Sequence, residues 1–67
     1  MRFTEEAISE FINAAKDVED LHRRKTEAIQ QLVDNPFAAL GSSFFVTAME
    51  SINKHFKEKR LKFNLPD

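Results

Sequence analysis

The sequence predicts an all-α fold for one domain that covers residues 1–67. The chain has one glycine and two prolines, and its first 35 residues contain neither type. Apolar residues in that stretch recur every three or four positions, the spacing of a helix with one buried face. A composition of 42% hydrophobic and 31% charged residues is typical of a folded helical chain rather than a disordered or all-β one.

The first predicted element is a long helix over residues 5–33. Thr4 is a suitable N-cap, and Glu5 and Glu6 suit the positive end of the helix dipole. The helix is expected to stop at residues 34–36, because the residue before Pro36 is pushed out of the α region.

A short helical elbow is predicted over residues 36–40, followed by Gly41 and a second helix over residues 43–59. Ser42 or Ser43 would cap that helix. Leu61, Phe63 and Leu65 then alternate with polar residues, which favours an extended carboxyl-terminal tail.

These lengths predict an elongated helical hairpin. A helix over residues 5–33 would be about 43 Å long, whereas the second helix would cover only its carboxyl half. The tail could then lie over the amino half, near Ile8 and Phe11. Without cysteine the chain has no disulfide to supplement a small core, so good helix packing or a second subunit must do so.

The width of the apolar face predicts a homodimer. The apolar positions of the long helix span about 200° of its circumference, whereas packing on one neighbour needs little more than about 100°. A two-fold pairing into a four-helix arrangement is the simplest cover. The predicted core and dimer face comprises Ile8, Phe11, Ile12, Ala15, Val18, Leu21, Ile29, Leu32, Phe45, Met49, Ile52 and Phe56.

Polar residues on this face suggest a second feature. His22 and Lys25 occupy positions where the pattern asks for a hydrophobic residue, and an antiparallel hairpin brings His55 level with His22. The simpler interpretation is that they lie at the rim of the core. A more specific interpretation is a polar layer that fixes the helix register. Another is a metal- or pH-responsive site between the histidines, although neither histidine has a companion at metal-ligand spacing in its own helix.

Charge is distributed unevenly along the chain. Residues 1–20 carry a net charge of −4 and residues 54–62 a net charge of +4, so an antiparallel hairpin would place opposite charges side by side. The alternative is a nucleic-acid patch from the basic clusters at 23–25 and 54–62, with Arg23, Arg24, Lys57 and Arg60 as its candidates. The basic residues of the second cluster spread around the helix, which disfavours that alternative.

The sequence favours docking to a partner over catalysis. Phe44, which lies off the apolar stripe of the second helix, and Phe63 are candidate partner contacts. No motif for catalysis, a metal or another cofactor stands out, and the longest apolar run is too short to span a bilayer. Glu5 and Glu6 do not suit a signal peptide, which favours a cytoplasmic address. We therefore expect a non-catalytic regulatory protein that acts as a helical homodimer and docks a protein partner; a nucleic-acid-associated dimer is the alternative.

Overall fold

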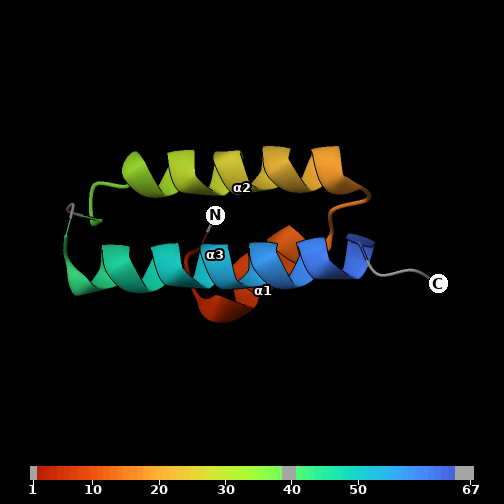
Figure 1. Cartoon of the computed structure of the whole chain (residues 1–67). Coiled ribbons are helices and arrows are strands. Elements are labelled where there is room, and N and C mark those ends of the chain that lie inside the picture. Colours follow the sequence, from red (N-terminus) through yellow and green to blue (C-terminus); the bar gives the residue numbers. More distant parts are fainter. Residues whose placement is uncertain (1, 39–40, 65–67) are drawn as a thin grey trace.

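A computed structural model of the chain describes residues 2–38 and 41–64, which form three helices and no strand. Helix α1 spans Glu5–Asn13, α2 spans Val18–Val33 and α3 spans Ser43–Asn64. Helices α2 and α3 run antiparallel, and α1 lies against α3 on a different side (Figure 1). The chain measures 41 × 17 × 16 Å along its principal axes. The all-α class is thus confirmed, and none of the described helices is long and apolar enough to cross a membrane.

The single helix predicted over residues 5–33 is wrong, because residues 14–17 separate α1 from α2. Asp17 is the N-cap of α2, and its Oδ1 accepts a hydrogen bond of 2.7 Å from the Asp20 amide. Asp20 in turn accepts a bond of 3.1 Å from the main-chain amide of Lys16. These two carboxylates satisfy amides that an uninterrupted helix would bond to its own carbonyls, so a new helix begins without glycine or proline.

The interruption lets α3 collect apolar side chains from two directions. Ile8 and Ile12 of α1 and Leu21 and Leu32 of α2 are fully buried, as is Ile52 of α3. A straight helix over residues 5–33 would extend beyond the hairpin and leave its amino half to the tail. Folding α1 back against α3 divides the wide apolar sector into two narrower faces, each of which one neighbour can cover.

Arg24 fixes α2 to the end of α1. Its Nη1 donates to the carbonyl oxygen of Phe11 at 3.0 Å, and its guanidinium carbon lies 4.9 Å from the centre of the Phe11 ring. The Nε atom of the same side chain donates to Asp20 at 3.2 Å. One guanidinium therefore bonds both to the residue beside the interruption and to the preceding helix.

The predicted elbow is only partly inside the described residues, since residues 39 and 40 lie outside them. Pro36 and Phe37 form a turn rather than a helix. Gly41 has a φ of 82°, the left-handed conformation that glycine adopts most easily. The predicted cap of the next helix is present, since Ser42 Oγ accepts a bond of 3.2 Å from the Phe45 amide.

The predicted end of the second helix at residue 59 and the extended tail are also wrong. Helix α3 continues to Asn64, so Leu61 and Phe63 are helical, and Leu65 lies outside the described residues. No helix-breaking residue stands between Ser43 and Asn64, and Phe63 follows Phe56 by seven residues on the same face. Phe63 packs against the core there, whereas Leu61 is 54% exposed. The alternation of apolar and polar residues at positions 61–65 therefore does not mark an extended segment: within α3, Phe63 continues the apolar face and Leu61 lies off it.

Candidate interaction surface

Most of the predicted core and dimer face is covered by the chain itself. Ile8, Ile12, Ala15, Leu21, Leu32, Ile52 and Phe56 are buried, while Phe11, Ile29, Phe45 and Met49 are half-buried against them. Only Val18 is exposed, at 37%. The apolar sector that suggested a second subunit is occupied by α3, so a dimer through the long helix loses the observation on which it was based.

The three residues of the predicted polar layer do not meet in one layer. The His22 ring packs edge-on against Phe56 at 5.1 Å, and Lys25 Nζ lies 4.2 Å from the centre of the same ring. His55 instead is buried under α1, with its Nε2 3.8 Å from Glu5 and its Nδ1 4.0 Å from Glu58. His22 and Lys25 are therefore rim residues, while His55 belongs to the contact between α1 and α3.

The basic residues at positions 23 and 24 are engaged by carboxylates of their own helix. Arg23 Nη2 lies 2.6 Å from Asp20 and its Nη1 lies 3.1 Å from Glu27. The hydrogen bond from Arg23, followed by that from the Lys16 amide, lowers the pKa of Asp20 to about 2. The same pairing raises the pKa of Arg23. Both predicted nucleic-acid contacts on α2 thus have local counter-ions, whereas Lys57 and Arg60 are exposed on α3.

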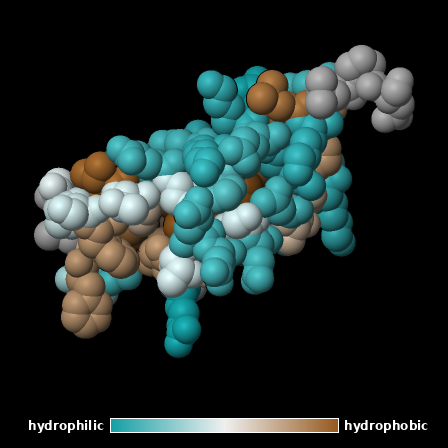
Figure 2. Space-filling model, turned by 90° about the horizontal axis from the view of Figure 1, so that it is seen from below, coloured by the Kyte–Doolittle hydropathy of each residue, from teal (hydrophilic) through white to brown (hydrophobic). Residues whose placement is uncertain are grey.

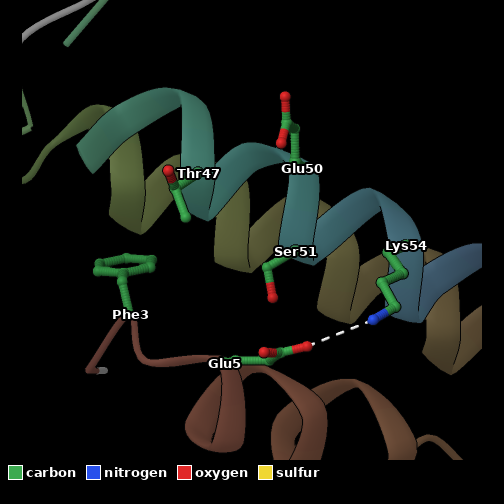
Figure 3. Close-up of a pocket in the computed structure, with 6 residues that line it drawn as sticks. All are labelled: Phe3, Glu5, Thr47, Glu50, Ser51 and Lys54. Atoms are coloured by element: carbon green, nitrogen blue, oxygen red, sulfur yellow. Dashed lines mark hydrogen bonds and ion pairs between the residues drawn. The ribbon is translucent and has the colours of Figure 1, made fainter. Parts of the chain in front are cut away.

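An ion pair joins the acidic amino-terminal segment to the basic segment of α3. Lys54 Nζ lies 3.4 Å from Glu5 Oε1, and both side chains are more than half exposed. These two residues line a cleft of about 220 Å³ with Phe3, Thr47, Glu50 and Ser51. Figure 3 shows the Ser51 hydroxyl directed from α3 toward Glu5, while Glu50 points away from α1. The cleft is open to solvent, since Glu5 is 66% exposed.

Ser51 and His55 have a spacing that could suggest nucleophilic catalysis, but their geometry does not support it. They lie four residues apart on one face of α3, with Glu58 three residues further. Ser51 Oγ and His55 Nε2 are both buried without a hydrogen-bond partner, so the bond that would activate the hydroxyl is not formed. Neither atom is accessible to a substrate.

A second hollow lies on the outer face of α2. Its volume is about 560 Å³, and it is lined by His22, Arg23, Thr26, Glu27, Gln30 and Gln31. All six belong to one helix, and their side chains are polar or charged. Within residues 2–38 and 41–64 no group of three histidine or acidic side chains could hold a metal ion.

Exposed apolar side chains lie instead where α2 ends and α3 begins, on more than one side of α3, since Phe44 and Val46 are two residues apart in that helix. Val33 is 51% exposed, Phe37 86%, and Phe44 and Val46 44% each. We call this set the apolar end. Apolar atoms gather at this end of the face shown in Figure 2, while hydrophilic atoms cover much of its middle. Residues 35–49 contain no Asp, Glu, Lys, Arg or His, so Phe37, Phe44 and Val46 lie in the longest uncharged stretch of a highly charged chain.

Phe37 is the most exposed large apolar residue of the described chain and is held on a hydrogen-bonded turn. The Ala38 amide donates to the Asn35 carbonyl at 3.0 Å, closing a four-residue β-turn. The Phe37 amide donates to Asn35 Oδ1 at 2.9 Å. Pro36 occupies the second position, where its fixed φ suits a turn, and Ala38 is buried.

Sequence reasoning missed Phe37, because helical spacing assigned the phenylalanines to the core. The uncharged stretch and the Asn-Pro turn signal could have identified it. Phe44, which was predicted, is partly exposed and packs edge-on against Phe3 at 6.2 Å. Phe63, the other predicted contact, packs against the core, and Lys59 Nζ lies 5.1 Å from the centre of its ring.

Comparisons with known proteins do not assign the chain to a family. Neither a protein-family model, nor a curated protein, nor a solved structure matches it.

Proposed function

We propose that the chain is a non-catalytic interaction protein that docks another macromolecule through the apolar end. The observation that carries this proposal is the exposure of Phe37, Phe44 and Val46 within a stretch that has no charged residue, with exposed Val33 just before it. Small charged proteins cover most such side chains, and clustered apolar exposure marks interaction sites. We further propose that the chain has a regulatory role and acts in the cytoplasm.

The docking surface in this proposal differs from the one expected from the sequence. A homodimer through the long helix is not needed to cover Ile8, Ile12, Leu21 or Leu32, because α3 already does so. A homodimer through the apolar end remains one way in which the surface could be used. The nucleic-acid alternative is less supported, since Arg23 and Arg24 are neutralised by Asp20 and Glu27.

The test is affinity capture from native cells with three forms of the full chain. One is the wild type, one is the double variant Phe37→Asp and Val46→Asp, and the matched control is Leu61→Asp. Leu61 is also exposed, at 54%, but lies near the opposite end of α3. Circular dichroism must show that all three forms keep their helices.

The proposal expects a macromolecule that the wild type and the Leu61→Asp control retain and the double variant loses. Purified again, that macromolecule should bind the wild type in a titration that changes little with salt. Equal capture by all three forms, or no capture, contradicts the proposal. Captured nucleic acid whose binding falls steeply with salt would favour the alternative.

A further inference from the structure

We propose that Phe37 is an anchor residue that inserts its ring into an apolar pocket of a partner protein, and that the turn over residues 35–38 holds it ready to bind. This inference rests on the proposed function and adds to it the contact residue and the kind of partner. It is carried by the turn geometry and by the 86% exposure of the Phe37 side chain.

The turn limits the conformational freedom that binding would remove. It is joined to α2 through the Asn35 amide, which donates to the Leu32 carbonyl at 3.2 Å, and it ends at the buried Ala38. Pro36 fixes one backbone angle, and Asn35 Oδ1 binds the Phe37 amide. Ordering a loop lowers affinity, so an aromatic ring already held by its backbone suits an anchor.

The surroundings of Phe37 define the chemistry of the partner. A ring that projects beyond its own chain needs a concave apolar site, because a flat surface would leave part of it in water. No charged residue lies between Asn35 and Met49, and the residues that border this stretch, Asp34 and Glu50, are acidic. The partner site should therefore have an apolar floor with a neutral or basic rim.

A second copy of this chain does not supply such a site in its described residues. The cleft beside Phe3 has Glu5, Glu50 and Lys54 in its lining, and the hollow on α2 is formed by the side chains of a single helix, so it is too shallow to enclose a phenylalanine ring. We therefore assign the anchor to a different protein.

A membrane surface is the other apolar environment to consider. Segments that insert into lipid interfaces usually carry Lys or Arg beside their apolar residues, which bind anionic headgroups. Residues 35–49 have none, and the bordering Asp34 and Glu50 would be repelled. The charge pattern therefore favours a protein pocket.

The experiment places a photoreactive benzoyl-phenylalanine at position 37 of the full chain in native cells, and at position 61 in a matched control. The proposal expects one main protein adduct from position 37 and none of that adduct from position 61. An adduct of twice the chain mass would overturn the inference in favour of a second copy. A lipid adduct, together with binding to vesicles of phosphatidylcholine and phosphatidylglycerol, would overturn it in favour of a membrane.

Binding of the purified adduct partner then tests the anchor and the turn separately. Phe37→Ala should raise the dissociation constant by about tenfold or more, as expected for a central aromatic contact. Asn35→Ala, which removes the side-chain bond to the Phe37 amide but leaves the ring, should raise it by a smaller factor.

The result also separates this inference from the proposed function. Further chains carry the photoreactive residue at position 44 or 46. If Phe37→Ala binds like the wild type while adducts form from these positions, the apolar end docks a partner but Phe37 is not its anchor. If no position of the apolar end gives an adduct, both fail. Phe37 lies at the surface, so its replacement should leave the helices intact and the comparison valid.

Discussion

Arg24 of α2 donates a hydrogen bond of 3.0 Å to the main-chain carbonyl of Phe11, and its guanidinium lies over the Phe11 ring. This contact connects residues on either side of the interruption at 14–17. Arg24 thereby donates to one of the carbonyls that the last turn of α1 leaves without a helical partner. The side chain is only 20% exposed, so water cannot readily replace it. Arg24 is thus a structural residue rather than a free cation.

Replacing Arg24 should destabilise the fold measurably. We expect Arg24→Ala to lower the free energy of unfolding by about 1–2 kcal/mol, because it removes charge-assisted hydrogen bonds and a cation–π contact. Arg24→Lys should recover only part of this loss, since one ammonium group cannot reproduce the planar contacts to Phe11 and Asp20. Urea titration followed by circular dichroism measures both.

The exposed Lys57 of α3 provides the control. Lys57→Ala should leave the urea midpoint nearly unchanged. Equal midpoints for Arg24→Ala and Lys57→Ala would mean that the contact between α2 and Phe11 contributes nothing to stability.

Asp20 should make the stability depend on acid pH. Its pKa in the folded chain is about 2, below the ordinary value of 3.8, because Arg23 and the Lys16 amide bind the carboxylate. Because the pKa of Asp20 is lower in the folded chain than in the unfolded one, its carboxylate stabilises the fold at pH values above about 4. That contribution is lost as the pH falls from about 4 to about 2. Thermal unfolding at a series of pH values should therefore show a falling melting temperature in this window.

Asp20→Asn removes the titrating group and should flatten the dependence in that window, besides lowering the melting temperature at neutral pH. Asp34→Asn is the matched control, because the side chain of Asp34, the C-cap of α2, accepts a bond of 3.1 Å from Gln30 and pairs with no arginine of the described residues. A slope that is the same in the wild type and in Asp20→Asn would assign the acid sensitivity to other carboxylates.

The sequence predicted the helical class, most of the buried positions and the caps at Thr4, whose Oγ1 accepts a bond of 3.1 Å from the Ala7 amide, and Ser42, because these depend on local chemistry and periodicity. It did not predict the interruption at residues 14–17. Local propensity favours helix at Ala14, Ala15 and Lys16, and the stability gained by packing α1 on α3 overrides it. Asp17 and Asp20 did carry a start signal, but alone such a signal is weak. Phe37 was missed for the opposite reason, since a buried and an exposed phenylalanine look alike in a sequence.

The carboxyl end of α3 gives a prediction that distinguishes a helix from an extended tail. Two residues apart in a helix, Leu61 and Phe63 point about 200° away from one another, whereas in a strand they share a face. Phe63→Ala should cost about 1–2 kcal/mol, less than the loss for a fully buried phenylalanine. Leu61→Ala should cost little, because Leu61 is 54% exposed. Similar losses in urea titrations of the two variants would support the extended tail.

Ser51 gives a prediction of increased stability. Its hydroxyl is buried without a hydrogen-bond partner, and serine is a weaker helix former than alanine. Ser51→Ala should therefore raise the free energy of unfolding by about 0.5–1 kcal/mol. Ser9 of α1 is the control, because its Oγ accepts a bond of 3.1 Å from Asn13 Nδ2, and Ser9→Ala loses that bond while gaining the same propensity. In urea titrations the free energy of unfolding should be higher for Ser51→Ala than for the wild type, and lower for Ser9→Ala than for Ser51→Ala. A loss of stability in Ser51→Ala would mean that the hydroxyl is satisfied in solution and that the cleft beside Glu5 holds a partner for it.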